Sequence, residues 1–240
     1  MSIIQRHFEE LADGRSDFLK SIRGGKVSIE TGARVILHPT GEVSADVTIG
    51  VNASLDIVIF AAAAAAIRIC LNFSLANFSS LKCLILSENC ENLEIKVAAS
   101  LDGENSNSSV KNFFFGENFS RQIFFASQRH GAKNSTSRVL SQTALDDFAT
   151  SEFHGNITIG ECAENSDAQQ RNGNVLLSEN ATAVSSPDLN ILNSNVKCSH
   201  GATVGSIDGD AMFYMTSRGI PQRKCKELAI EGMLLSLINS

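Results

Sequence analysis

The sequence lacks the features of a nucleic-acid-binding, secreted or membrane-spanning protein. Among its 240 residues, 20 Lys and Arg stand against 26 Asp and Glu, and no basic stripe could follow a phosphate backbone. The most apolar stretch, residues 57–70, contains Arg68 and is too short to cross a bilayer. The N-terminus carries no basic region followed by an apolar run, as a signal peptide would. We therefore expect a globular cytoplasmic protein with no nucleic-acid or membrane partner.

The chain has six cysteines but no CxxC motif. Cysteines dispersed in this way in a cytosolic protein are expected to be free thiols rather than disulfides. Cys70, Cys83 and Cys162 fall in strand-like runs and are predicted to be core thiols. Cys225 is predicted to lie on the apolar face of the last helix.

The motifs of common enzyme classes are absent too. There is no P-loop G-x-x-x-x-G-K-[ST], no dinucleotide-binding G-x-G-x-x-G, no G-x-S-x-G elbow and no H-E-x-x-H. Asp146 and Asp147 are the only adjacent pair of aspartates. A β-solenoid enzyme acting on carbohydrates would instead use carboxylates from neighbouring coils. Because the sequence does not reveal which strands lie side by side, that alternative stays open.

The first of three segments, residues 1–25, is predicted to form one or two short amphipathic helices. Apolar residues recur there at helical spacing on both sides of a polar segment. They are Ile4, Phe8 and Leu11, followed by Phe18, Leu19 and Ile22. Gly24 and Gly25 then close the segment.

The second segment, residues 26–206, is predicted to be a mainly β core. Short apolar runs alternate with period two between Gly, Asn, Asp or Ser, for example Val27/Ile29, Val47/Ile49, Leu81/Cys83/Ile85, Leu93/Ile95/Val97, Ile157/Ile159 and Leu189/Ile191. The runs often recur about every ten residues, which suits a β-sandwich or a stacked β-solenoid, with the balance toward the solenoid. The alanine run at 61–66 is predicted to be a strand because its flanks are β-branched or aromatic, with a helix as the alternative.

The third segment, residues 207–240, is predicted to form a helical hairpin. Asp208 is placed to cap the first helix, Arg218 lies in its last turn, and Gly219 takes the position that needs a positive φ. Pro221 is expected at the first position of the second helix. Such a hairpin either docks a partner or caps the end of the sheet, and the pattern leaves both alternatives open.

Cys198 and His200 are the candidate site residues. They lie two positions apart in what reads as a glycine-flanked turn, and on a strand they would share one face. A thiolate and an imidazole are good ligands for soft or borderline metals and iron–sulfur clusters, although two ligands cannot complete a site. A thiol–imidazole nucleophile and a structural role are also compatible with the pair. His130 and His154, each beside a glycine, are predicted to be turn or surface histidines.

The stretch around this pair closely resembles the C-terminal signature of the SufB/SufD family, the scaffold subunits of the SUF iron–sulfur cluster assembly machinery. The family pattern carries an SHGAT-G turn, an acidic spacer, FY, SRG and a terminal amphipathic helix. This chain supplies SHGATVG at 199–205, Asp208, FY at 213–214 and SRG at 217–219. Residues 166–191 resemble the family's D-A-x-Q, L-L-S and P-x-L-x-I blocks. The resemblance covers roughly residues 129–240, and the CSHGAT-G form is similar to the SufD branch.

The resemblance implies a right-handed parallel β-helix flanked by helices, in a scaffold subunit that is not itself an enzyme. It implies pairing with a SufB-type subunit, or with a second copy, through the end of the β-helix. The chain is shorter than a typical SufD, with the family's N-terminal region reduced to residues 1–25. Two alternatives are kept, a carbohydrate-active β-solenoid enzyme and a structural homodimer that has lost cluster assembly.

The resemblance also implies roles for individual residues. His200, and less directly Cys198, would hold a transient iron–sulfur cluster at the subunit interface, where the partner chain supplies the missing ligands. Residues 207–240 would bind the SufC ATPase through a region that contains Phe213, Tyr214, Arg218, Gly219 and Pro221.

Overall fold

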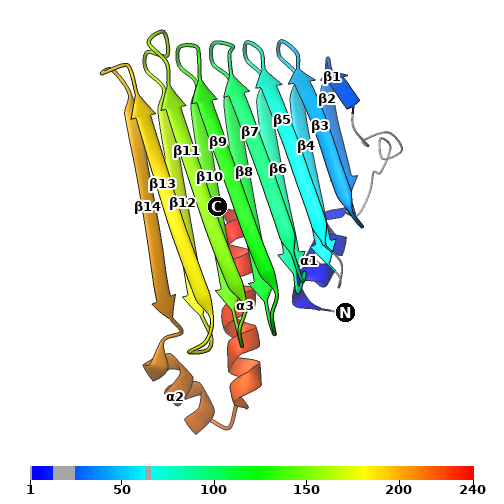
Figure 1. The fold of residues 1–240 in the computed structure, drawn as a ribbon, viewed down its shortest axis with the longest axis vertical. Helices are drawn as coiled ribbons and strands as arrows, with labels where there is room; N and C mark the ends of the chain where they lie inside the picture. Colours follow the sequence, from blue (N-terminus) through cyan, green and yellow to red (C-terminus); the bar gives the residue numbers. More distant parts are fainter. Residues whose placement is uncertain (1, 13–24, 63–65) are drawn as a thin grey trace.

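The computed structural model describes residues 2–12, 25–62 and 66–240, and its centre is a solenoid of two β-sheets packed face to face (Figure 1). Within these residues, successive strands along the chain alternate between the two sheets. The strands are β1 (Gly25–Ile29), β2 (Gly32–Leu37), β3 (Glu42–Ile49), β4 (Ser54–Ala62), β5 (Ile67–Leu75), β6 (Ser80–Glu88), β7 (Leu93–Leu101), β8 (Asn107–Gly116), β9 (Arg121–His130), β10 (Thr136–Leu145), β11 (Thr150–Ile159), β12 (Asp167–Leu176), β13 (Thr182–Ile191) and β14 (Lys197–Ser206).

Each strand pairs in parallel with the strands two places before and after it. The odd-numbered strands form one sheet, the odd sheet, and the even-numbered strands form the other, the even sheet. The chain therefore winds into a β-helix in which each coil advances by one strand spacing of about 4.8 Å. The predicted parallel β-helix is confirmed.

Asparagine shapes the corners between the strands. Most corner residues with a positive φ are Asn or Asp, which tolerate the left-handed region better than bulky residues do. They are Asn52, Phe78, Asn89, Asn105, Asn118, Asn134, Asp147 and Asn165. Corners of neighbouring coils also bond one another, since the Glu117 N–H donates to Asn89 Oδ1 at 3.0 Å. Their place at the corners explains why Asn and Asp residues beside the apolar runs of the sequence mark the ends of the strands.

The interior of the solenoid changes character along its axis. The early coils are filled by aliphatic side chains such as Ile49, Ile69 and Ile85. From β8 onward, polar side chains become frequent in the interior, among them Ser108, Asn112, Gln122, Gln128, His130, Ser137, Ser141, Thr143, Gln170, Asn172 and Asn174. Some bond each other, as Thr143 Oγ1 does when it donates to Asn174 Oδ1 at 2.6 Å. A buried polar group without such a partner is costly, so each of these positions constrains the packing.

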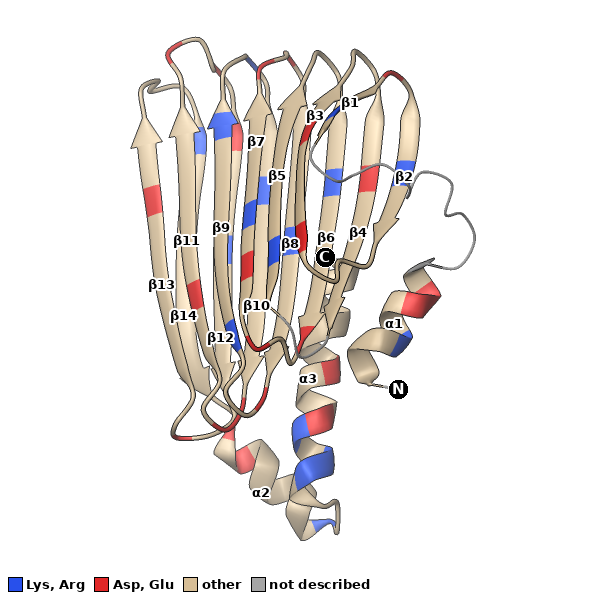
Figure 2. Cartoon of the chain, turned by 45° about the vertical axis from the view of Figure 1, so that its right-hand side comes forward, with Lys and Arg blue, Asp and Glu red and all other residues tan. Residues whose placement is uncertain are grey.

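Two helices cover the outer face of the even sheet. α1 (Ile3–Ala12) and α3 (Gln222–Asn239) lie side by side there (Figure 2). Ile4 and Phe8 of α1, with Leu234 and Leu237 of α3, are buried against outward-facing apolar residues of this sheet. Full burial of a side chain of this size contributes about 1.5–3 kcal/mol. The expected N-terminal helix is confirmed for Ile3–Ala12, whereas the second half of that segment lies outside the described residues.

A third helix, α2 (Gly209–Ser217), follows β14 directly. The carboxylate of Asp208 accepts hydrogen bonds from two N–H groups in the first turn of α2. Gly219, just after the end of this helix, has a φ of +85°. Both predictions are confirmed. Pro221 caps α3 rather than being its first residue, because its ψ is extended at 142° while its carbonyl already accepts the first bond of the helix.

The two histidines flanked by glycine differ from one another. His130, predicted at a turn or on the surface, is fully buried as the last residue of β9. It occupies an inward-facing strand position, where its ring nitrogens bond the hydroxyls of Ser135 at 2.7 Å and Ser137 at 2.8 Å. His154 is a partly exposed residue of β11, in keeping with a surface position, and its ring stacks on Phe125 with centroids 4.8 Å apart.

The cysteine predictions are partly wrong. Cys83 and Cys225 are buried as predicted, and Cys70 is half-buried on the outer face of the odd sheet. Cys162 is exposed, because it lies past the end of β11 in the turn to β12. The alanine run is a strand as far as Ala62, where β4 ends.

Parts of two expectations fall outside the described residues: Phe18, Leu19 and Ile22, and positions 63–65 of the alanine run. Among the helices of residues 2–12 and 207–240, none is long and apolar enough to cross a membrane.

Candidate functional site

Cys198 and His200 lie on a strand and not in a turn. They belong to β14, the last strand of the even sheet, which pairs with β12 along its whole length and sets His200 opposite Gln170. Gly201 and Gly205, which suggested the turn, face open space and need no unusual backbone angle. Ten consecutive residues of β14 pair with β12, and this pairing overrides the local preference of the glycines for a turn.

The two side chains share one face of β14, as predicted for a strand. Alternate residues of a strand point the same way, and both face the solenoid axis, about 6.6 Å apart along the strand. His200 is exposed, whereas Cys198 is half-buried. Cys198 packs against the interior cluster of Ile157, Ile159, Ala163 and Ala168. The pair therefore spans the boundary between the solenoid interior and solvent.

The surroundings of Cys198 do not suit a nucleophile. Burial raises the pKa of its thiol, and the Asp167 carboxylate nearby adds to the rise. The thiol is therefore protonated at neutral pH, and the thiolate is the reactive form. A metal ion can still bind the sulfur by displacing the proton. These surroundings argue against a thiol–imidazole nucleophile at Cys198.

The pair alone cannot complete a metal site. Across residues 2–12, 25–62 and 66–240, no group of three His, Cys, Asp or Glu side chains is placed to hold a metal ion. Structural zinc sites and iron–sulfur clusters use about four protein ligands. A metal or cluster held by Cys198 and His200 therefore needs donor atoms from outside these residues.

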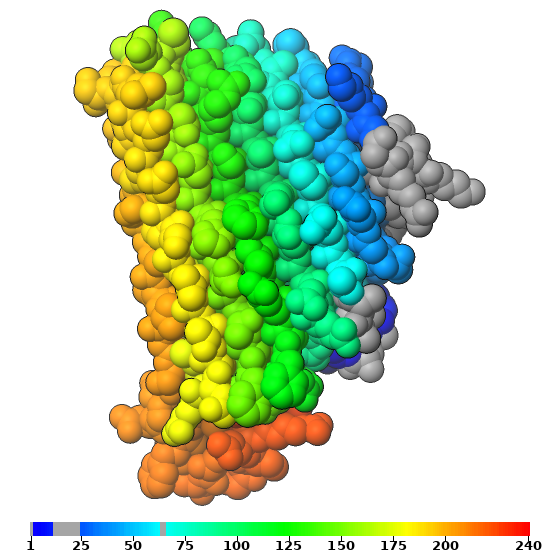
Figure 3. Space-filling view, viewed as in Figure 1, coloured from blue at the N-terminus to red at the C-terminus, as the bar shows by residue number. Residues whose placement is uncertain are grey.

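The strands β13 and β14 form what we call the open end of the solenoid. No strand of the described residues pairs with the outer edge of either, so the backbone groups on that side are free. Val184, Leu192 and Val204 are exposed large apolar residues in this region. Figure 3 shows this end as one whole side of the molecule, coloured yellow to orange. Free strand edges with exposed apolar side chains are typical of a surface that pairs with another chain.

The C-terminal hairpin, which comprises α2, residues 218–221 and α3, carries a second exposed surface. α2 lies beyond the ends of the strands and has no buried residue, so it does not cover the sheet (Figure 1). Phe213 is 76% exposed and Tyr214 is 59% exposed. The Arg218 guanidinium lies over the Tyr214 ring, 5.2 Å from its centroid. Exposed aromatic and arginine side chains of this kind often dominate protein–protein binding.

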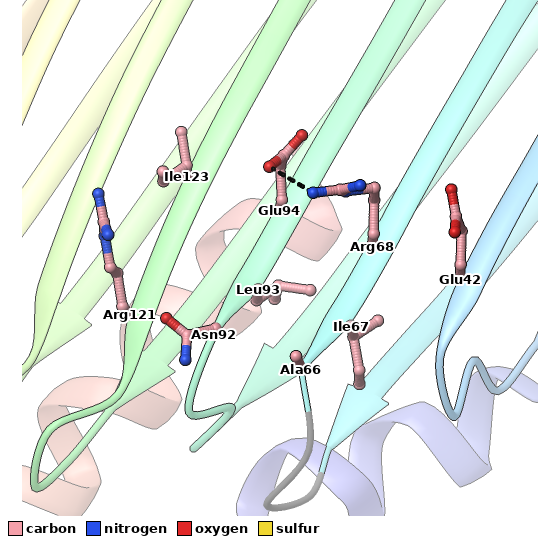
Figure 4. Close-up of a pocket in the computed structure, with 9 residues that line it drawn as sticks. All are labelled: Glu42, Ala66, Ile67, Arg68, Asn92, Leu93, Glu94, Arg121 and Ile123. Atoms are coloured by element: carbon pink, nitrogen blue, oxygen red, sulfur yellow. Dashed lines mark ion pairs between the residues drawn. The ribbon is translucent and has the colours of Figure 1, made fainter.

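A groove of about 350 Å³ on the outer face of the odd sheet tests the carbohydrate-active alternative (Figure 4). Glu42, Arg68, Glu94 and Arg121 line it. A hydrogen bond from Lys96 is the main cause that holds the pKa of Glu94 below its usual range, and Arg68, 3.6 Å away, adds to it. Glycosidases need a carboxyl group whose pKa is raised, so that it can donate a proton. The pKa of Glu94 is lowered instead, so Glu94 does not meet this requirement.

Comparison with known proteins agrees with the motif resemblance. Residues 40–233 match the family model described as SUF system FeS cluster assembly, SufBD core domain. The chain belongs to this SufBD family. The match begins well before residue 129, so the family relationship includes the early coils of the solenoid as well as the C-terminal motifs.

The relatives of this SufBD family chain include SufD and SufB proteins. SufD of Escherichia coli K12 is 39% identical over 101 residues, which cover 42% of this chain and 24% of that protein. SufD of Bacillus subtilis is 34% identical over 123 residues, 51% of this chain and 27% of that protein. SufB of the same bacterium is 20% identical over 152 residues, 63% of this chain and 29% of that protein. The matched segments span about a quarter of these relatives, and the higher identity to SufD confirms the SufD-like resemblance.

Sequence reasoning missed two polar residues next to the candidate pair. Gln170 and Asn172 lie on β12 and are buried in the solenoid interior, one strand away from His200. A signal was available, since Gln170, Asn172 and Asn174 recur with period two. On a strand, that period places all three side chains on the same face.

Proposed function

We propose that this chain is a SufD-like scaffold subunit of a cytoplasmic SUF iron–sulfur cluster assembly complex, without catalytic turnover of its own. The observation that carries the proposal is the position of His200 and Cys198 at the open end of the solenoid, on a strand with a free edge. In this proposal, residues 26–206 are the scaffold, residues 207–240 bind an ATPase, and residues 1–25 are an N-terminal helical segment.

The open end is proposed to pair with a SufB-type subunit or with a second copy of this chain. An interface there would bring the partner's side chains beside His200 and Cys198 and supply the ligands that this chain lacks. A ligand set divided between two chains also suits a scaffold, because a cluster held in this way can be released when the interface opens. His200 is the first candidate ligand, since it is exposed, and Cys198 is the second.

The C-terminal hairpin is proposed to bind a SufC-type ATPase. Its binding region contains Phe213, Tyr214, Arg218, Gly219 and Pro221. The support is the exposure of both aromatic rings on a helix that buries none of its own residues. Gly219 and Pro221 set the direction of the turn that joins α2 to α3.

Co-expression of this chain with the SufC-type and SufB-type proteins of the same cell, followed by mass determination, tests the partners. We expect Phe213→Ala to weaken ATPase binding at least tenfold. Phe119→Ala is the matched control, because Phe119 is equally exposed, at 77%, but lies in the turn between β8 and β9. ATPase binding that survives deletion of residues 207–240 would remove the docking role.

Cluster assembly on the purified complex tests the site. We expect His200→Ala to abolish the iron–sulfur absorbance while the complex keeps its mass, and Cys198→Ser to reduce the absorbance less. His154→Ala is the control, since His154 is a partly exposed histidine on the opposite sheet. Unchanged assembly in His200→Ala, with the complex intact, would remove His200 as a cluster ligand. A wild-type complex that assembles no cluster would instead favour a structural dimer that has lost cluster assembly.

A further inference from the structure

Gln170 has a fully buried side chain whose hydrogen-bonding capacity is unused. Its exposed fraction is 0%, and neither Nε2 nor Oε1 has a hydrogen-bond partner among the described residues. Leaving a buried amide unpaired costs about 1–3 kcal/mol. Each such group in a native structure therefore needs a physical reason.

The amide of Gln170 sits in a space made for it by a glycine. Gly155 lies across the interior on β11, and a Cβ added to it would stand 2.0 Å from Nε2 and 2.4 Å from Oε1 of Gln170. Any other residue at 155 would fill the position of this amide. The place of the Gln170 side chain is thus defined by both sheets.

The same amide lies directly under the last coil. Gln170 is paired with His200 in the even sheet, and Gly155 is paired with Pro187 in the odd sheet. Neighbouring strands are about 4.8 Å apart, and side chains in register on one face lie within reach of each other. Both Gln170 and His200 face the axis, so His200 is part of the cover over the Gln170 amide.

We propose that Gln170 is the positioning residue for His200. The two side chains are not bonded in the structure of the single chain. When a partner chain covers the open end, Oε1 of Gln170 accepts a hydrogen bond from one ring N–H of His200, which leaves the other ring nitrogen free as a metal donor. Histidines that bind metals nearly always donate their second N–H to such a partner, which sets both tautomer and ring orientation. The inference rests on the proposed role of His200 as a cluster ligand, and it gives the unused amide a function.

Gln128 provides a matched control within the same solenoid. It too is fully buried, with neither amide atom bonded among the described residues. Its neighbours in register are Ile157 and Ala99, so no imidazole lies beside it in the sheet. If ordered water bonds the unpaired amides of this interior, it does so for Gln128 and Gln170 alike. A difference between variants at the two positions would then come from the positioning role of Gln170.

The first test uses the assembled complex, with labelled histidine in this chain, and reads the tautomer of His200 from its ring nitrogen signals. Gln170→Met keeps the length of the side chain but removes the acceptor, and we expect it to change the ratio of the two tautomers. Gln128→Met should leave the ratio as in the wild type. An unchanged ratio in Gln170→Met, or an equal change in both variants, would overturn the proposal. If Gln170→Met does not fold, Gln170→Leu, which also lacks the acceptor, replaces it, and an unchanged tautomer ratio in that variant overturns the proposal too.

The second test measures binding of Fe²⁺ to the assembled complex. Loss of an outer partner of a ligating histidine typically weakens metal binding 10–100-fold, so we expect that loss in Gln170→Met and none in Gln128→Met. The two levels of inference fail separately. A tautomer change without any loss of Fe²⁺ binding contradicts the ligand role of His200, whereas loss of binding in His200→Ala with no effect of Gln170→Met contradicts only the positioning role.

Discussion

Lys226, near the start of α3, donates to both carboxylate oxygens of Asp146, which lies 80 positions earlier in the turn after β10, at 2.8 and 2.6 Å. The side chains of the pair are only 24% and 15% exposed. This ion pair anchors the N-terminal part of α3, the helix that packs along the even sheet. Because α2 joins α3 through a short turn, the contact also positions the surface proposed to bind the ATPase.

Replacement of Lys226 by Met should therefore lower the free energy of unfolding by about 1–2 kcal/mol, more than an exposed ion pair contributes, because it leaves a half-buried carboxylate without its partner. Urea denaturation measures the change. Arg223→Met is the control, since Arg223 is 92% exposed and its ion pair within the described residues is with Glu227, one turn along. It should cost no more than about 0.5 kcal/mol. Equal losses in the two variants would contradict a structural role for the Lys226 contact.

Alanine substitutions at Gly103 and Gly155 are expected to lower the free energy of unfolding by different amounts. A Cβ on Gly103 would stand 2.0 Å from the backbone carbon of Ala76, which cannot move aside. The three atoms nearest to a Cβ on Gly155 all belong to the Gln170 side chain. We expect Gly103→Ala to cost about 3 kcal/mol or more and Gly155→Ala about 1–2 kcal/mol. Urea denaturation of both variants measures the difference.

A double-mutant cycle identifies the cause at Gly155. Removing the obstructing amide with Gln170→Ala should restore most of the stability lost in Gly155→Ala. Gly173→Ala is the control, because the nearest atom to its added Cβ is at an ordinary 3.6 Å. A Gly155→Ala defect that persists in the double variant would show that the amide is not the obstacle.

The buried His130 predicts a loss of stability in mild acid. Burial lowers the pKa of its ring to about 4, below the ordinary value of 6.5 that the unfolded chain retains. Between these two values the unfolded chain binds more protons, so stability falls as the pH drops from 6.5 toward 4, by about 3 kcal/mol in total.

Urea denaturation at pH 7 and pH 4.5 measures this dependence. Carboxylates contribute to the slope as well, so the comparison is between wild type and His130→Gln, which should lose less stability over this range. A His130→Gln variant with the wild-type slope would contradict the assignment.

The free thiols predict an order of modification. Cys162 is exposed, while burial raises the pKa of Cys83 to about 12 and of Cys90 to about 11. Alkylation requires an accessible thiolate, so iodoacetamide at pH 7 should modify Cys162 at least about tenfold faster than these two. Cys198, with a raised pKa and partial exposure, should lie between them. Peptide mass spectrometry follows each site, and Cys83 labelling at the Cys162 rate in the native protein would contradict the buried assignment.

The apolar alternation predicted the early coils and failed in the middle of the chain. β8, β9 and β10 had no apolar run of their own, because several of their inward positions are polar, among them Asn112, Gln128 and Ser141. A period-two pattern in polar residues carries the same geometry, but hydrophobicity alone does not reveal it. The same weakness led His130 to be placed on the surface and Gln170 to be overlooked.

Features that depend on neighbours a few positions apart could be predicted from the amino-acid sequence. The cap at Asp208, the positive φ at Gly219 and the alternation of the early strands are of this kind, because their hydrogen bonds and faces are set within one turn or one strand. The family motifs at 199–219 also identified the SufBD family without any structure.

Contacts between residues of different coils, in contrast, could be read only from the folded chain. Partners in this solenoid are about 30 positions apart, as in the pairing of Gln170 with His200, and their meeting depends on the register of parallel strands and the length of every corner between them. Burial of His130, exposure of Cys162 and the strand at 197–206 all follow from that register. The local conformational preferences of the residues do not reveal such contacts, because each contact is formed between separate coils.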